Sequence, residues 1–511
     1  MRKICTTFLI FYLFHFGAAS IVSKVFTFDN AKKVGSLVMK SYTLEKKVND
    51  DTPEVIQALS TELNAATNNL RNLGLFVREN LDGIVLSIPE DVETATEINN
   101  DLRDIFNRIV LINGLFKSFY LEYVDKKISD TSLNVFIAKA TSIDEDSPAI
   151  NSFKIYSLIH PGNLGYLKPC FFSRIAQQLK TNVFQRCKKH QSPQQFLFEL
   201  YDLIETVETR AFMMITTAYK LKSLKDNENL SREMQFAHNE HEKRLHDYLS
   251  DLQGVVNGAS TLMFSCMPQY YSLNHLEPQL TYAVSLRPKI SDYNNNMVVT
   301  GLRLVVLKGI IHIQIEEGKL GVNGDIVAGT ERWIPVDDMD FASKTIHQNG
   351  VNSHMSIGTD FQTVTWWDYV ETAVRTVPEN CVIVGANFDT YDISDTNKKI
   401  FYLRLHYAKI VFSTGEVIPS TYSTTHEITY GWGNYEVFAL NREIKSFSAN
   451  SNGNENFVNL PNSYLDWQNV VGEPRIPFTG VGFKKYDNPS YGRSLSLQVS
   501  TLNLMSRIDI N

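Results

Sequence analysis

The chain has 511 residues, of which 43% are hydrophobic and 11% aromatic, and its formal net charge is −7. This excess of acidic residues disfavours a nucleic acid partner, because a surface that binds phosphates needs a positive field. The length and the apolar content are sufficient for two full-sized hydrophobic cores.

The N-terminus has the pattern of a cleaved secretory signal. Arg2 and Lys3 precede the apolar run ICTTFLIFYLFHFG, and the small residues GAAS follow it. The run is shorter than the roughly 20 residues that cross a bilayer as a helix, and no other stretch is long and apolar enough to span. We therefore expect residues 1–20 to be a signal peptide, the mature chain to be secreted and extracellular, and no integral membrane span. Loss of the two cations moves the charge from −7 to −9.

Residues 21–257 have a helical period and predict a helical bundle domain. One run begins at Thr52-Pro53-Glu54 and continues through Leu59, Leu63, Leu70 and Leu73. A capping box at Ser87, Pro89 and Glu90 precedes a second stripe: Val92, Ala95, Ile98, Leu102, Ile105, Ile109, Ile112, Phe116 and Phe119. A third run begins at Ser192-Pro193 and includes Phe196, Leu200, Leu203, Val207, Ala211, Met214 and Ala218. A charged helix over 231–252 should bury Phe236, Leu245, Leu249 and Leu252.

Four cysteines follow the signal: Cys170, Cys187, Cys266 and Cys381. An even number in an oxidising compartment predicts two disulfides, with three pairings open. One unbroken helix would hold Cys170 and Cys187 about 25 Å apart. A break at Thr181-Asn182 would let them meet, which favours Cys170 with Cys187 and Cys266 with Cys381. The predicted N-glycosylation acceptor is Asn229, in Asn229-Leu230-Ser231.

Beyond Asn257-Gly258 the apolar period changes to two. We expect 258–290 to be a linker and 291–511 an all-β antiparallel domain, which gives a segregated α+β fold with the helical bundle first. A short strand with a central glycine recurs three times in this half, as VVTGLRL (298–304), VIVGANF (382–388) and PFTGVGF (477–483). A glycine inside a strand indicates a bulge or the close approach of another backbone.

The three copies predict three small sheets about a pseudo-threefold axis, as in a β-prism, or two sheets packed as a sandwich. Gly301, Gly385 and Gly480 should then occupy equivalent places. The third copy reaches the C-terminus before its strands are complete, and LTYAVSLRP at 280–288 is the expected source of a missing strand.

The series VVTGLRL, IIHIQIEEGKL and ERWIPVDD, the series VIVGANF, FYLRL and FSTGEVI, and the helical LYDLIETVETRAFMMITTAYKL at 200–221 resemble a family of secreted insect proteins. That family is known mainly as a domain of unknown function. The resemblance is clearest over residues 190–495. It implies an extracellular insect protein, and it carries over no catalytic residue and no disulfide pairing. A binding protein of this kind would belong to haemolymph, a matrix, or a glandular secretion such as saliva.

The motifs of common enzymes are absent from the sequence: there is no G-x-S-x-G, no G-x-x-x-x-G-K-[ST] and no G-x-G-x-x-G. Asp389, Asp392, Asp395 and Asn397 are oxygen ligands suited to calcium, the one cofactor that the sequence suggests, although a soluble turn has the same composition. Trp366 and Trp367 suit stacking on a sugar, but one of two neighbours in a strand faces inward. His238, His241 and Glu242 share a helix face, which indicates a surface metal site or a solvated polar face.

Two functions remain. The first is a non-enzymatic, lectin-like binding protein, whose β-domain loops take a glycan or an extracellular protein. The second is a toxin-like or membrane-interacting effector, because some insecticidal pore-forming toxins also place a helical bundle before a threefold β domain. The bundle carries charges on its outer faces, which favours the first function, as at Glu122, Asp125, Lys126 and Lys127. Without a nucleophile, base and orienting group, the sequence does not predict an enzyme.

Overall fold

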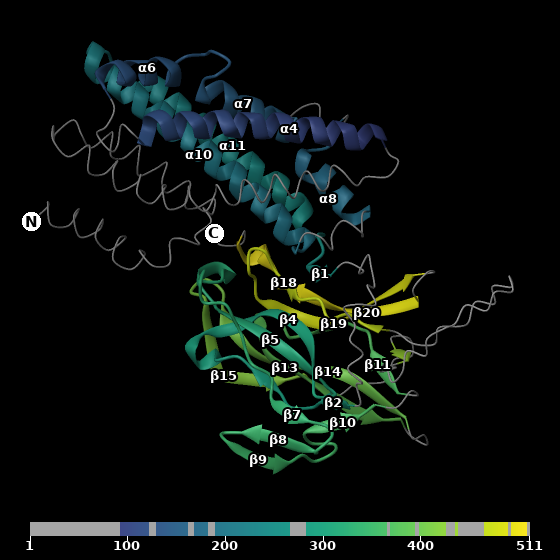
Figure 1. Cartoon of the computed structure of the whole chain (residues 1–511). Helices are drawn as coiled ribbons and strands as arrows, with labels where there is room; N and C mark the ends of the chain where they lie inside the picture. Colours follow the sequence, from purple (N-terminus) through teal and green to yellow (C-terminus); the bar gives the residue numbers. More distant parts are fainter. Residues whose placement is uncertain are drawn as a thin grey trace, which may run out of the picture. The chain divides into compact units, whose positions relative to one another are not determined.

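The computed structural model describes residues 92–121, 129–161, 168–181, 190–265, 283–364, 368–393, 398–425, 435–437, 464–488 and 492–507. It divides into two compact units. The helical unit comprises Met1–Gln185, Pro193–Ser260 and Arg507–Asn511, and the sheet unit comprises Arg186–Ser192 and Thr261–Ser506. Helices therefore dominate the first half and mixed sheets the second, which makes the chain an α+β protein (Figure 1).

The helical unit is built around one long helix, α10 (Pro193–Asp226), which contacts every other helix of that unit within the described residues. These are α4 (Val92–Leu115) with its π-helical continuation (Phe116–Leu121), α6 (Asp130–Ala140), α7 (Pro148–Ile159), α8 (Phe171–Thr181) and α11 (Ser231–Val256). Side chains cap two helix starts: Ser129 accepts from the Ser132 amide and Ser147 from the Ile150 amide. Within the described residues, no helix is long and apolar enough to cross a membrane.

The predicted stripes of α4 and α10 are confirmed where the structure describes them. On α4, Ile98, Leu102, Ile105, Ile109, Ile112 and Phe116 are buried. All the predicted core residues of α10 are buried as well, but so is every other residue from Pro193 to Ala218. The prediction for α11 is wrong at Phe236, which is 67% exposed, and right at Leu245 and Leu252. The run from Thr52 and the capping box at Ser87 lie outside the described residues.

Three hairpins form the sheet unit, and they share one pattern of pairing. They are β4 (Met297–Leu307) with β5 (Ile310–Lys319), β13 (Cys381–Asp392) with β14 (Lys399–Val411), and β19 (Phe478–Asn488) with β20 (Gly492–Thr501). The register of each hairpin shifts by a bulge immediately before its glycine: Gly301, Gly385 and Gly480. The predicted bulges are confirmed.

A short strand from elsewhere lies opposite each glycine. Val471 of β18 (Val470–Val471) pairs with Gly301, Ile290 of β3 (Lys289–Ile290) with Gly385, and Thr376 of β12 (Arg375–Thr376) with Gly480. A Cβ at Gly385 would lie 2.5 Å from the carbonyl oxygen of Lys289. Only glycine allows this approach, which explains why a glycine recurs at the same position of all three hairpins.

A second short strand runs parallel to the outer strand of each hairpin. β2 (Ala283–Ser285) pairs with β5, β11 (Tyr369–Glu371) with β14, and β17 (Tyr464–Leu465) with β20. The expected all-antiparallel domain is therefore wrong at these pairs. Each parallel strand leads within a few residues to the strand that lies opposite a glycine in another sheet. The connection from β2 to β3 thus links the first sheet to the second, β11 to β12 links the second to the third, and β17 to β18 links the third to the first.

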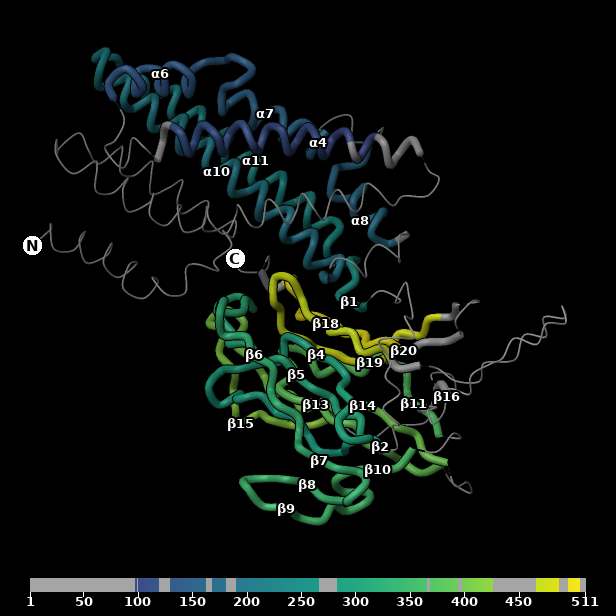
Figure 2. Tube along the Cα trace, viewed as in Figure 1, coloured from purple at the N-terminus to yellow at the C-terminus, as the bar shows by residue number. Residues whose placement is uncertain are grey.

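The remaining strands extend the three sheets. The first sheet has the order β10-β2-β5-β4-β18 with β6 beside β5, the second β16-β11-β14-β13-β3 with β15 beside β14, and the third β1-β20-β19-β12 with β17 beside β20. A small separate sheet has the order β7-β8-β9. Their bounds are β1 Leu262–Phe264, β6 Arg332–Trp333, β7 Asp338–Asp340, β8 Thr345–Gln348, β9 Val351–His354, β10 Phe361–Thr363, β15 Glu416–Thr424 and β16 Tyr435–Val437 (Figure 2).

The segment expected to be a linker, 258–290, is not a linker: it contributes β1, β2 and β3. The strand within LTYAVSLRP also has a different partner from the one expected. It is β2, which joins the first sheet, whereas β1, β12 and β17 complete the third. Short strands with few local contacts are positioned by the sheet they join, and the sequence pattern does not identify that sheet.

Candidate binding site

The outer strand of each hairpin has one apolar and one polar face. In β5, Ile311, Ile313 and Ile315 alternate with His312, Gln314 and Glu316, and all six are buried. The outer strands can be aligned on the residue that pairs with the glycine, which is Glu316 in β5, His406 in β14 and Ser500 in β20. The positions that correspond to the polar face of β5 are then Tyr402, Arg404 and His406 in β14, and Ser496, Gln498 and Ser500 in β20. Each sheet thus presents polar groups to the segments that cross it.

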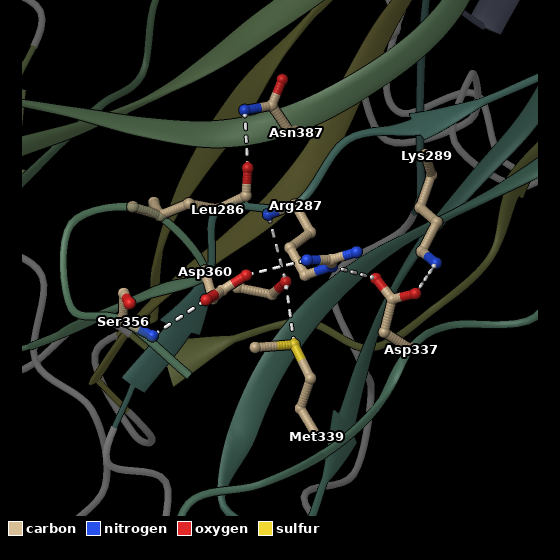
Figure 3. Close-up of polar contacts among 9 residues, drawn as sticks. Leu286, Arg287, Lys289, Asp337, Met339, Ser356, Asp360 and Asn387 are labelled. Carbon is tan, nitrogen blue, oxygen red and sulfur yellow. Dashed lines mark hydrogen bonds and ion pairs between the residues drawn. The ribbon is translucent and has the colours of Figure 1, made fainter. Parts of the chain in front are cut away.

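Four charged residues meet where the chain crosses the first sheet, and we call them the charge cluster: Arg287, Lys289, Asp337 and Asp360. Arg287 Nε lies 3.3 Å from Asp337 Oδ2, and its Nη1 lies 2.8 Å from Asp360 Oδ1. Lys289 Nζ lies 2.9 Å from Asp337 Oδ1. Figure 3 shows both cations directed at the Asp337 carboxylate, with Arg287 bridging the two acids. The cluster is compact and balanced in charge.

Backbone hydrogen bonds fix the segment that carries these cations. The Leu286 amide donates to the Asp360 carbonyl (2.9 Å), and the Leu286 carbonyl accepts from Asn387 Nδ2 (3.0 Å). Asp360 is held in turn, since its Oδ2 accepts from the Ser356 amide at 2.8 Å (Figure 3). Ser285 Oγ accepts from the Arg287 amide at 3.3 Å. The site is therefore preorganised by strands of two sheets and by the insertion between β5 and β11.

His312 lies close to the charge cluster. The side chain is 1% exposed, and neither ring nitrogen has a hydrogen-bond partner among the described residues. Burial lowers the pKa of His312 to about 4, with Lys289 adding to the effect and Asp337 opposing it. The imidazole is therefore neutral at physiological pH, and its ring nitrogens are unsatisfied among the described residues, unlike the side chains of Gln314 and Glu316 on the same face.

The second sheet has a hydrogen-bonded network at His406. Asn387 Nδ2 donates to backbone carbonyls, so its Oδ1 accepts from His406 Nε2 (2.9 Å), and His406 Nδ1 accepts from the Tyr422 hydroxyl (2.6 Å). Burial, followed by Arg404, lowers the pKa of His406 to about 4, which fits this neutral tautomer. The Tyr422 ring lies between Tyr293, at 5.3 Å, and His406, at 5.9 Å. Tyr422 therefore stacks on two rings while it remains 39% exposed.

In the third sheet Asp466 accepts hydrogen bonds where the chain crosses. Ser496 Oγ donates to it at 2.6 Å, and Gln468 donates through its backbone amide (3.1 Å) and its side chain (2.9 Å). Burial raises the pKa of Asp466, and these hydrogen bonds oppose the rise. The crossings of the first and third sheets are therefore both polar, but each uses different residues.

The described calcium candidates already have cationic partners. Asp389 pairs with Arg404 at 2.5 Å, and Asp392 pairs with Lys399. Asp395 and Asn397 lie outside the described residues, as do Trp366 and Trp367. Across the residues that the structure describes, no three acidic, histidine or cysteine side chains are grouped to hold a metal ion.

The helical unit has its own buried charges. Glu208 Oε1 accepts from Arg244 Nε (2.9 Å) and Nη2 (2.7 Å), and His241 Nδ1 lies 3.5 Å from the same oxygen. Burial raises the pKa of Glu208, but Arg244 and His241 more than offset this and lower it to about 2. His241 is buried and stacks on Phe212 at 4.4 Å. It therefore does not share a surface with His238 and Glu242.

Cys170 and Cys381 both have free thiols in the structure. Cys187 and Cys266 lie outside the described residues, but each favoured bridge would use one of these two free thiols, so neither predicted bridge is formed in the structure. The described part of α8 reaches Thr181, and the expected helix break at Thr181-Asn182 stays a prediction because the residues after it lie outside the described part of the chain.

The predicted glycosylation acceptor lies in the exposed turn between α10 and α11. Asn229 Oδ1 accepts from the Ser231 hydroxyl at 2.6 Å and from its amide at 3.2 Å. The side chain is exposed, so an attached glycan would extend into solvent.

The sequence does not identify the charge cluster, although it explains why neighbouring acids of β5 bind different cations. Glu316 binds Arg475 while Glu317 binds Arg332, as expected for neighbours on opposite faces of a strand. Arg287, by contrast, meets acids 50 and 73 residues away. The only signal in the sequence is the density of charges in LRPK and PVDD, which is common on surfaces.

Residues 184–283 match a family model described as Domain of unknown function (DUF4803). The matched segment includes α10, α11 and β1. No curated protein matches the chain. The hairpin series that prompted the wider resemblance therefore lies outside the matched residues, and the similarity concerns the helical hairpin and the start of the sheet unit.

Proposed function

We propose that this protein is a secreted, non-enzymatic binding protein whose sheet unit presents loops to a glycan or to an extracellular protein. The sheets would be arranged about a pseudo-threefold axis, in the manner of a β-prism. The observation that carries the proposal is the repeated register: a bulge, a glycine and a crossing strand recur in each hairpin. A strand pairing that stays the same while the loops between the strands differ is typical of scaffolds that bind through their loops.

The contacts among the hairpins support the threefold arrangement over a sandwich. The glycine-containing strands β4, β13 and β19 all contact one another. The Phe388 and Phe483 rings, from two of these strands, stack at 6.5 Å. Three sheets that meet along their first strands share one core, whereas a sandwich packs two sheets face to face.

The segments that join the hairpin strands differ and are the proposed ligand contacts. They comprise residues 308–309, 393–398 and 489–491. The second contains the calcium candidates Asp395 and Asn397, and Trp366-Trp367 precede β11 of the same sheet. A glycan ligand would use aromatic stacking and a few hydrogen bonds there.

A glycan array probed with the mature chain, with and without calcium, tests the proposal. We expect binding of a defined glycan class that is lost in Trp366→Ala or Trp367→Ala and kept in Trp467→Ala, a tryptophan outside this segment. Binding that persists in chelator would remove calcium from the proposal. Silence on every glycan would exclude the glycan ligand and leave a protein ligand.

The alternative is an effector that acts on membranes, and a liposome assay separates the two. The binding function predicts no release of dye from neutral or anionic vesicles at neutral or acidic pH. Release that depends on protein concentration would favour the effector and count against the proposed function.

A further inference from the structure

The small sheet ends in an unprotected edge strand. Among the strands that the structure describes, β9 pairs with β8 only, and all four of its residues are exposed. It is reached through a tight turn at Asn349 and Gly350, both with positive φ (51° and 80°). In Figures 1 and 2 the hairpin of β8 and β9 lies at the lower margin of the sheet unit, with no strand beyond β9.

The register of this hairpin shows which backbone groups point outward. Gln348 pairs with Val351 across the turn, Ile346 pairs with Ser353, and the Met355 amide donates to the Lys344 carbonyl at 2.9 Å. Hydrogen-bonded and non-hydrogen-bonded pairs alternate in an antiparallel ladder. The N–H and C=O groups of Asn352 and His354 are therefore directed away from β8, toward the free edge.

This edge lacks the charged residues and prolines by which many proteins block strand addition. The sequence VNSHMSI, 351–357, contains no Lys, Arg, Asp, Glu or Pro, and it exposes Val351 (64%) and Ile357 (63%). β15, an edge of the second sheet, contains Glu416 and Pro419 instead. Charges and prolines normally protect exposed edges, so their absence indicates an edge that is used.

We propose that β9 pairs antiparallel with β9 of a second copy of this chain, about a twofold axis at Ser353. This register places Asn352 opposite His354 of the second copy, so the outward groups of both strands form hydrogen bonds. Val351 lies opposite Met355 of the second copy, and no like charges oppose each other. An extended peptide of another protein would use the same backbone groups, but the twofold register satisfies the outward groups of both strands at once, which favours a second copy.

The small size of the edge makes the dimer weak. Short interfaces belong to the transient class, with dissociation constants between about 1 μM and about 1 mM. The two Ser353 side chains form a non-hydrogen-bonded pair, in which Cα atoms approach to about 4.5 Å. A charge introduced at this position therefore meets its own copy directly.

Sedimentation of the full-length chain over a concentration series tests the pairing. We expect wild type to dimerise reversibly, and Ser353→Lys and Ser353→Glu each to weaken dimerisation at least about tenfold, because like charges oppose each other across the axis. An equimolar mixture of the two variants should restore the dimer, since the charges are then complementary. Ser250→Lys, which adds the same charge at an exposed position of α11, is the matched control and should dimerise like wild type.

Three results would overturn the proposal. They are a wild-type chain that stays monomeric up to about 1 mM, a Ser353→Lys variant that dimerises like wild type, and a mixture that stays monomeric. His354→Pro gives an independent check, because it removes one outward N–H and leaves the ladder with β8 intact. Circular dichroism that matches wild type confirms that each variant is folded.

Discussion

Two cations at equivalent positions of the crossing segments obtain their carboxylate partners from different parts of the chain. Lys289 and Arg375 both lie one residue before the residue opposite a glycine. Arg375 binds Glu371 of its own segment, at 2.5 Å. In the first sheet Ser285 stands where Glu371 stands in the second, and Asp337 of the insertion supplies the carboxylate for Lys289 instead. The charge cluster therefore restores a pairing that the local segment lacks.

His312 should make the stability of the sheet unit depend on pH. Its pKa is about 4 when folded and about 6.5 when unfolded, so between these values only the unfolded chain takes the proton. Stability is fully present above pH 6.5 and falls as the pH drops to 4, by at most on the order of 3 kcal/mol. His312→Leu should flatten part of this fall without loss at pH 7, because it removes an unsatisfied polar group.

Urea unfolding between pH 4 and pH 7.5 measures this effect. His406 keeps its own contribution in the variant, so the slope should decrease and not vanish. His246→Leu, which replaces an exposed histidine of α11, is the control. An unchanged slope in His312→Leu would show that another group causes the pH dependence.

The hairpins show that one small residue decides how strands meet. At Gly385 a Cβ would lie 2.5 Å from Ile290 Cδ1 and from the Lys289 carbonyl, so β3 could not pair there without a shift. At Gly254, on α11, nothing lies within 4 Å of such an atom. Two glycines of the same chain thus differ in purpose: the first admits a strand, and the second costs helix stability.

Alanine substitutions should therefore have opposite effects at the two glycines. We expect Gly385→Ala to destabilise the sheet unit by about 1–3 kcal/mol, through overpacking. Gly254→Ala should stabilise the helical unit by about 0.5–1 kcal/mol, through lower backbone entropy in the unfolded chain. Thermal unfolding followed by circular dichroism measures both. A neutral Gly385→Ala would mean that the close approach of β3 is not required.

At the scale of the whole molecule, the two units are not consecutive in the sequence. Residues 190–192 belong to the sheet unit, where the Glu473 amide donates to the His190 carbonyl (2.8 Å) and Thr501 Oγ1 to Ser192 Oγ (3.0 Å). The next residue, Pro193, begins α10 of the helical unit. A division at one boundary near residue 258 therefore misses a segment that precedes the central helix.

Export is a property of the whole chain and is testable with the sequon. Expression in insect cells should yield a secreted product that begins near residue 21 and carries a glycan at Asn229. Ser231→Ala should remove the glycan, whereas Ser231→Thr should retain it, because the acceptor requires a hydroxyl two residues on. Intact mass before and after glycosidase measures all three. An unmodified wild-type product retained in cells would contradict the export prediction.

The sequence by itself determined the features that depend on local periodicity and on glycine. The helical stripe of α4, the start of α10 at Pro193 and the bulges at three glycines are set by neighbouring residues, so they could be predicted. The tertiary structure alone decided which strand enters which sheet, the exposure of Phe236 and the assembly of the charge cluster. These depend on contacts between residues far apart in the chain, and a short strand or a single charge has the same local pattern wherever it packs.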